Sequence, residues 1–260
     1  MNQPSNLETA LAGLLEKYSV QPPGPWRLLT APEPTAAGTL TLLSGVALTD
    51  GNAPAHVVPL QAWRCERRFV ELKRIVDERT IDPVVMARFA CLVHGSTADL
   101  AAVLYRELDL AEWILGAPLQ TVSAHVAGGR QANLMVRLAS GVLCGIEAGT
   151  SLPAGSPCQD RHELIARRGV ACDRVVDTQV AQSSIYVFGP QAQQFTDVDA
   201  ELFGLSIDEV ALVRSAYEVL ARPELASAAR RQHARLRKLV ETALASDRSR
   251  KRLTVEGAAA

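Results

Sequence analysis

The spacing of apolar residues changes from a helical to a strand-like period near residue 119, and this change constrains the fold more than any other feature. From Leu119 to about Phe188, apolar and polar residues alternate, as they do in strands with one buried face. Gly128 and Gly129 separate the first two such segments and are typical of a tight hairpin turn. Further segments extend the series at residues 141–149, 162–170 and 183–188. Consecutive strands joined by short turns predict an antiparallel meander with one face packed on helices.

One side of this sheet is predicted to be at least partly polar. Asn133 and Arg137 share one face of the second strand, at residues 132–138, opposite an apolar face. Successive side chains of a strand point to opposite faces, so the apolar set is expected to meet the helices. Met135 and Tyr186 would place larger side chains in the same broad sheet.

Segments with helical apolar spacing surround the predicted sheet. They cover residues 7–18, 64–79, about 99–115, 210–220 and 224–246. Ser206 and Glu209 have the spacing of a capping box at the start of the fourth helix. Strands are expected from Thr39, at residues 84–94 and, briefly, at 250–255, whereas the Pro-rich stretch at 21–35 favours loops.

The predicted fold class is α+β, with a large, mostly antiparallel sheet packed on one face by helices and no complete Rossmann domain. Residues 1–60 are expected to be an N-terminal extension with a short helix, Pro-rich loops and a strand. Residues 61–256 would form the α+β domain, and residues 257–260 a tail.

Composition excludes several classes of partner. Hydrophobic residues make up 48% of the 260 residues and charged residues 21%, which is typical of a globular protein. A net charge of −1 argues against nucleic acid or an anionic membrane held by bulk charge. No apolar run approaches the roughly 18 residues that span a bilayer. Five scattered cysteines without a C-x-x-C pair favour reduced thiols, so we expect a cytoplasmic protein. Histidines lack the spacing of metal ligands, so no metal is expected.

Several segments resemble the carboxy-terminal domain of the glucose–fructose oxidoreductase / inositol dehydrogenase (Gfo/Idh/MocA) family. D-L-A-E-W-I-L-G-A-P-L-Q-T-V-S-A, from Asp109, looks like that family's helix ending in Asp-x-x-x-Trp-x-x-Gly and the first long strand after it. R-H-E-L-I-A-R-R-G-V is similar to its strand-turn-strand, with Gly169 in the turn. L-V-E-T-A-L-A-S-D-R-S-R-K-R-L-T-V is similar to its closing helix and last strand. The resemblance covers roughly residues 60–256 and implies an oxidoreductase-related fold.

The sequence departs from the family at the sites that serve hydride transfer. The resemblance implies a preceding Rossmann domain with G-x-G-x-x-G and a Glu-Lys-Pro motif, and neither motif occurs. The family's helix reads Asp-x-x-x-His-x-x-Asp; anchored on Asp109 and Trp113, its histidine position falls on Arg106 and its first aspartate position on Ala102. A guanidinium stays protonated at any working pH and cannot alternate as general acid and base. We therefore expect no catalytic residue of the family's kind, and no NAD(P) unless a partner supplies it.

A second kind of site remains open. His94, Asp99, Arg106 and Asp109 could line a relocated pocket for a sugar-like or anionic molecule. The favoured alternative is that the charges among them form an ion network at the surface or at a cleft edge.

Two functions follow from these expectations. In the resembling family the sheet face turned away from the helices commonly mediates subunit association, so Asn133, Met135, Arg137 and Tyr186 are candidate interface residues. The favoured hypothesis is a catalytically degenerate assembly, accessory or regulatory subunit, in a homodimer or in a hetero-oligomer with a full-length oxidoreductase. The alternative is an oxidoreductase component or a cofactor-independent enzyme that uses the remaining cleft, with any NAD(P) supplied by a partner subunit.

Overall fold

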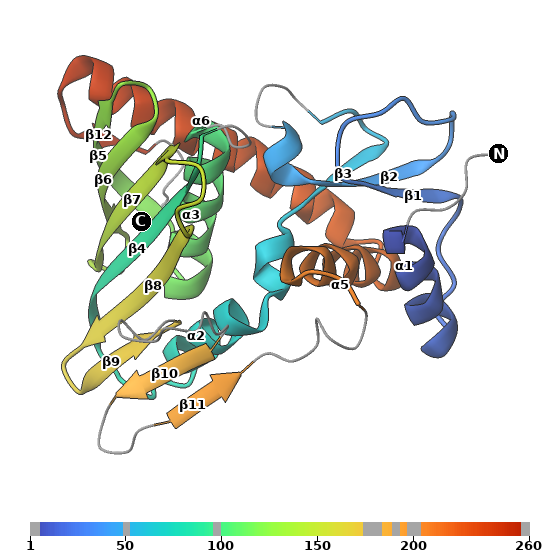
Figure 1. Ribbon diagram of the computed structural model, residues 1–260, viewed down its shortest axis with the longest axis horizontal. Helices are drawn as coiled ribbons and strands as arrows, with labels where there is room; N and C mark the ends of the chain where they lie inside the picture. Colours follow the sequence, from blue (N-terminus) through green and yellow to red (C-terminus); the bar gives the residue numbers. More distant parts are fainter. Residues whose placement is uncertain are drawn as a thin grey trace. The chain divides into compact units, whose positions relative to one another are not determined.

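The chain forms two compact units, each of which draws on separate parts of the sequence. The computed structural model describes residues 6–48, 53–95, 100–173, 184–188, 193–196 and 204–255 (Figure 1). The first unit combines residues 1–66 with 198–235, and the second combines 67–197 with 236–260. This division differs from the predicted boundaries at residues 60 and 256, because a helix late in the sequence packs on the N-terminal segment.

The first unit is a small parallel sheet with helices against it. Its strands lie in the order β1-β2-β3, and both pairings are parallel. Its elements are α1 (Asn6–Lys17), β1 (Trp26–Leu29), β2 (Leu40–Ser44), the 3-10 helix η1 (Gly45–Leu48), β3 (Val57–Leu60), the 3-10 helix η2 (Ala62–Cys65) and α5 (Ile207–Ala221). Residues 30–39, which connect β1 to β2, contain no helix. The start of α6 (Leu225–Ser249) also belongs to this unit.

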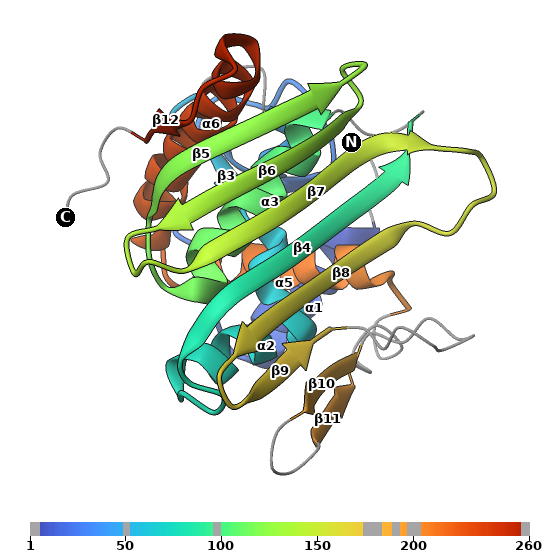
Figure 2. The ribbon, with the colours of Figure 1, turned by 90° about the vertical axis from the view of Figure 1, so that its left-hand side faces the viewer.

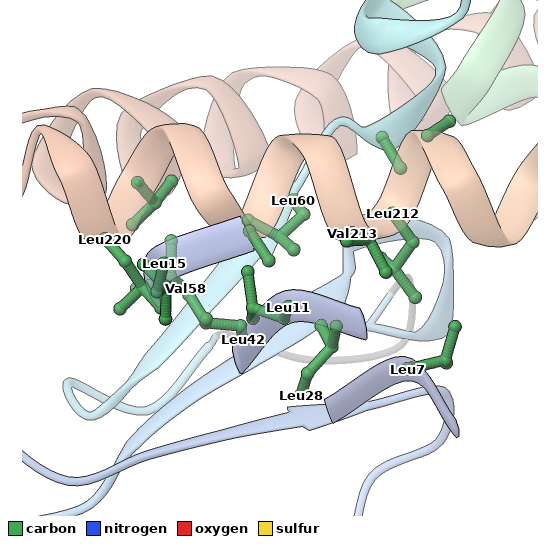
Figure 3. Close-up of a cluster of buried hydrophobic side chains, with 14 of the residues drawn as sticks. Leu7, Leu11, Leu15, Leu28, Leu42, Val58, Leu60, Leu212, Val213 and Leu220 are labelled. Atoms are coloured by element: carbon green, nitrogen blue, oxygen red, sulfur yellow. The ribbon is translucent and has the colours of Figure 1, made fainter. Parts of the chain in front are cut away.

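Leucine and valine side chains from α1, the strands and α5 form the core of the first unit (Figure 3). Leu11 and Leu42 are fully buried within it. The predicted helix near residue 7 and the strand from Thr39 are confirmed as α1 and β2, whereas β1 and β3 were missed. β3 contains Pro59, which lacks an N–H and is tolerated because this strand lies at the edge of the sheet.

The second unit is built on a sheet of nine strands in the order β11-β10-β9-β8-β4-β7-β6-β5-β12 (Figure 2). The strands are β4 (Val84–His94), β5 (Leu119–Ala127), β6 (Gln131–Leu138), β7 (Leu143–Leu152), β8 (Gln159–Ala166), β9 (Gly169–Cys172), β10 (Ser184–Phe188), β11 (Gln193–Thr196) and β12 (Leu253–Thr254). The hairpin between β5 and β6 turns at Gly128 and Gly129, whose φ angles are 58° and 67°. The predicted hairpin is therefore confirmed, with glycines where positive φ is needed.

The predicted meander is wrong at one place, because β4 lies between β7 and β8. β4 runs parallel to β7 and antiparallel to β8, so the sheet is mixed. Local alternation identified each strand but contains no information about a partner that is distant in the sequence. The mostly antiparallel character is retained, since every other neighbouring pair is antiparallel.

Helices cover one face of this sheet. α2 (Arg67–Asp77) and α3 (Leu100–Leu115) lie behind the strands in Figure 2, and α3 contacts β4, β6 and β7. The last turns of α6 attach to β5 through Ser246, whose hydroxyl accepts from the Ala124 N–H at 3.1 Å. No helix among the residues that the structure describes is long and apolar enough to cross a membrane.

Candidate functional site

Charged side chains form a cluster between the covered face of the large sheet and the helices α2 and α3. This cluster, termed the ion network below, consists of Arg68, Arg106, Glu107, Asp160, His162 and Asp173. α2 supplies Arg68, α3 supplies Arg106 and Glu107, and β8 supplies Asp160 and His162. Asp173 directly follows β9, and its N–H donates to the His162 carbonyl at 3.1 Å. Alternation along β8 turns residues 160 and 162 towards the helices.

His162 lies at the centre of the ion network and has no exposed surface. Its Nδ1 is 2.7 Å from Asp173 Oδ2, and its Nε2 is 2.9 Å from Glu107 Oε2. The rings of Phe69 and Phe89 meet the imidazole edge to face, at centroid distances of 4.7 and 4.8 Å. The ring is thus held by two carboxylates and two aromatic side chains.

Arginines complete the network on the side nearer to solvent. Arg106 binds both Asp160 oxygens, Nη1 to Oδ1 at 3.0 Å and Nη2 to Oδ2 at 2.8 Å, and also donates to Glu107 at 2.7 Å. Arg68 donates to Asp160 at 2.5 Å and to Asp173 at 3.1 Å. With His162 protonated, each of the three cations contacts at least two carboxylates of the network.

These contacts shift the pKa values of its members. Burial by itself would lower the pKa of His162, but Glu107 and Asp173 outweigh it and raise that pKa to about 9. Burial would likewise raise the pKa of Asp160, but Arg106, then Arg68 and His162, hold it well below its usual range. At neutral pH the imidazole is therefore a cation and Asp160 an anion.

The predicted ligand-binding residues occupy different surroundings. Arg106 belongs to the ion network, which is more buried than the predicted cleft-edge network. His94 ends β4, and its Nδ1 lies 3.1 Å from the Pro153 carbonyl oxygen. Asp109 is fully buried within α3, so it cannot meet a ligand from solvent. Asp99 lies outside the described residues.

Sequence reasoning missed most of the ion network. Glu107 carried a usable signal, because it occupies the same helical stripe as Val103 and Leu110, which are buried apolar residues. An acid within an apolar stripe needs a buried partner. That partner, His162, lies on β8, 55 residues later in the chain. No local spacing could have identified it.

Within the described part of the chain, Cys91, Glu107 and Asp160 present ligand atoms within 4.8 Å of one another. These residues do not fit a metal ion well. Glu107 and Asp160 already pair with Arg106, a fixed cation that would repel a metal. Burial, and then Glu107, raise the pKa of the Cys91 thiol, so the thiolate that binds a metal is disfavoured. We therefore interpret the group as part of the ion network.

The uncovered face of the large sheet contains a groove of about 450 Å³. Met135 lies beside Gly145, which has no side chain, and Met86, Arg88, Glu147 and Arg161 also line the groove. Asn133 also lines the groove, and Arg137 is exposed on the same face of β6. Tyr186 lies in β10, where its backbone pairs with Cys172, but its side chain is outside the described structure.

No protein-family model and no curated protein matches this sequence. Solved structures do match. An oxidoreductase from Agrobacterium radiobacter, in complex with NAD+, L-tartaric acid and magnesium, superposes with a TM-score of 0.64 at 14% identity over 84% of this chain and 73% of its own. Myo-inositol 2-dehydrogenase from Lactobacillus plantarum superposes with a TM-score of 0.61 at 13% identity over 89% and 80%. The chain shares its fold with these oxidoreductases.

Identities this low establish the fold alone. Apo levoglucosan dehydrogenase gives a TM-score of 0.66 at 11% identity, with 97% of this chain and 88% of that chain covered. Against a putative oxidoreductase from Thermotoga maritima, the TM-score is 0.55 at 13% identity, and 76% of this chain spans 63% of the other. Activity and partners are therefore not transferred by these similarities.

Proposed function

We propose that this chain is an accessory or assembly subunit, related to oxidoreductases, that associates through the uncovered face of its large sheet. It pairs with a second copy or with a full-length oxidoreductase, and it does not transfer hydride by itself. The observation that carries this proposal is that Arg106 is paired with carboxylates. Arg106 holds the position at which the resemblance implies a proton-transferring histidine.

The contacts of Arg106 are those of a structural ion pair. Its guanidinium binds Asp160 through two nitrogens and also donates to Glu107. A group that stays charged cannot accept a proton from a substrate hydroxyl during oxidation. His162 does not replace it, because it is fully buried and both ring nitrogens contact carboxylates.

The connection between β1 and β2 in the first unit supports the proposal that the chain has no dinucleotide site of its own. Rossmann folds hold the pyrophosphate at the N-terminus of the helix that follows the first strand. Here residues 30–39 lead from β1 to β2 without a helix. NAD(P) would then have to be supplied by a partner subunit.

The uncovered sheet face supports association. Met135 is 46% exposed at the groove, and Leu143 is exposed on the neighbouring strand β7. Arg88, Glu147 and Arg161 line the same groove. An apolar centre with a charged rim is the usual composition of a protein interface.

Light scattering after size-exclusion chromatography tests the association. We expect a dimer for the chain alone. We expect a defined complex when the chain is co-expressed with a full-length oxidoreductase that is encoded by a neighbouring gene. Met135→Glu should dissociate either assembly, because it buries an unpaired carboxylate in the interface. Val70→Glu, at a residue that is 40% exposed on α2, is the matched control and should leave the assembly unchanged. A monomer that binds no oxidoreductase would contradict the proposal.

Cofactor titration separates this proposal from the alternative, an oxidoreductase component or cofactor-independent enzyme acting on a sugar-like or anionic molecule. NAD(H) and NADP(H) should not raise the melting temperature of the isolated chain, because a ligand stabilises only a state that binds it. Turnover of a sugar or sugar acid by the chain alone would refute the non-catalytic role.

A further inference from the structure

Arg68 and Arg106 converge on a single carboxylate from two different helices. Arg106 binds both oxygens of Asp160, and Arg68 binds one of them, at 2.5 Å. Planar guanidinium groups recognise carboxylates through such paired hydrogen bonds, which are among the stronger ones in proteins. The two arginines therefore have the arrangement of a carboxylate-binding site.

The position of this pair does not depend on Asp160 alone. The Arg68 guanidinium carbon lies 4.2 Å from the centroid of the Phe69 ring, and that of Arg106 lies 5.1 Å from it. Each arginine also contacts a second, fully buried carboxylate: Arg68 binds Asp173 and Arg106 binds Glu107. Helices α2 and α3 and these contacts would hold both guanidinium groups in place if Asp160 moved away.

Asp160 differs from the other two acids in the ion network. Its side chain is 28% exposed, whereas those of Glu107 and Asp173 are inaccessible. It is the second residue of β8, and the residues before it, 153–159, are mostly exposed. Glu107 belongs instead to the middle of a helix, and Asp173 accepts from the His162 N–H at 2.7 Å. Asp160 is thus the acid that solvent reaches and that borders an exposed loop.

The two guanidinium groups define what could take its place. Withdrawal of Asp160 would remove a carboxylate that both of them contact. We propose that Arg68 and Arg106 form a binding site for the acid group of a small carboxylate, such as a hydroxy acid or a sugar acid, and that Asp160 occupies this site as an internal ligand. The bound acid takes the place of the Asp160 carboxylate and accepts the hydrogen bonds that Arg68 and Arg106 donate to it. This site is separate from the sheet-face interface, so each can be disproved without the other.

Variants that remove the internal ligand test this site. Asp160→Ala deletes a carboxylate whose size matches formate, and Asp160→Gly leaves room for acetate. In formate at about ten times its Kd, the melting temperature of D160A should rise by about 3 to 5 °C above its value in sodium chloride of equal ionic strength. By calorimetry, D160A should bind formate at least about tenfold more tightly than the unmodified chain, since a tenfold change corresponds to 1.4 kcal/mol of competition. The unmodified chain should still bind glycolate weakly.

Controls decide between a binding site and a general salt effect. Glu78→Gln removes a carboxylate from the exposed Arg74–Glu78 pair and should show no formate-specific stabilisation. Arg106→Gln combined with D160A should abolish formate binding. The proposal is overturned if D160A shows no preference for formate over chloride, or if the unmodified chain binds no glycolate at the highest soluble concentration. If D160A does not fold, D160G must yield more soluble protein in acetate than in chloride; equal yields also overturn it.

Discussion

Raising the pH should weaken the fold of the second unit, because His162 loses a proton that two buried carboxylates hold. Glu107 and Asp173 overcome the effect of burial and raise the pKa of this imidazole to about 9. Its pKa in the unfolded chain is the ordinary 6.5. A pKa that is higher in the folded state adds stability that is complete below about 6.5 and is lost as the pH rises through about 9.

The size of this effect follows from the shift. The difference between about 9 and 6.5 is about 2.5 pKa units. Each unit corresponds to 1.36 kcal/mol, so the free energy of unfolding should fall by about 3 kcal/mol between pH 6.5 and pH 9. His162 is fully buried, so solvent screening does not reduce this contribution appreciably.

Urea unfolding at intervals from pH 6 to pH 9 measures this contribution directly. His162→Gln should be less stable at pH 6.5 and should lack most of the decline. His125→Gln is the control for the loss of an imidazole, because the His125 side chain is 63% exposed. The series stops at pH 9 because burial also raises the pKa values of Cys65, Cys91 and Cys144, so their thiols lower stability once the pH passes about 8.5, the pKa of an unfolded cysteine. This loss is common to both variants, and the difference between their profiles isolates His162. A flat profile for the unmodified chain between pH 6.5 and 9 would refute the reasoning.

Three further substitutions test other parts of the structure. Ser246→Ala should lower the free energy of unfolding by about 1 to 3 kcal/mol in urea titration, because the Ala124 N–H loses its buried acceptor; no change would exclude a role for this bond in attaching α6 to β5. Leu11→Ala should lower the free energy of unfolding of the first unit by about 2 to 5 kcal/mol, since this side chain is fully buried (Figure 3). A smaller decrease would mean that the core collapses around the cavity. Gly95→Ala should cost at least about 1 to 3 kcal/mol, as a Cβ there would lie 2.2 Å from the Thr150 carbonyl oxygen; a melting temperature equal to that of the unmodified chain would show that the backbone shifts freely.

Several elements could be predicted because their causes are local. The glycine pair at residues 128–129 marked the hairpin, and Ser206 with Glu209 marked the start of α5, where both capping bonds are present. The helix predicted at residues 64–79 forms as α2 at Arg67–Asp77, after a 3-10 turn. The exposed face of β6, with Asn133 and Arg137, also agrees with the alternation.

The parts that were missed depend on residues far apart in the chain. β4 enters the sheet between β7 and β8, and α5 joins the first unit although about 140 residues separate it from η2. The ion network collects its members from α2, α3 and β8 and from a position after β9. Apart from Glu107, which lies in an apolar stripe of α3, each of these residues looks like an ordinary surface charge in its own segment.

The sequence by itself determined the helices, most of the strands of the large sheet, the turn between β5 and β6, and which side of β6 is apolar. Those properties depend on side-chain period and backbone preference over a few residues. Tertiary structure alone decided that Arg106 meets Asp160 and that His162 lies between two acids. Their pairing compensates for the free energy of desolvating charges, and such compensation exists only when distant segments are folded together.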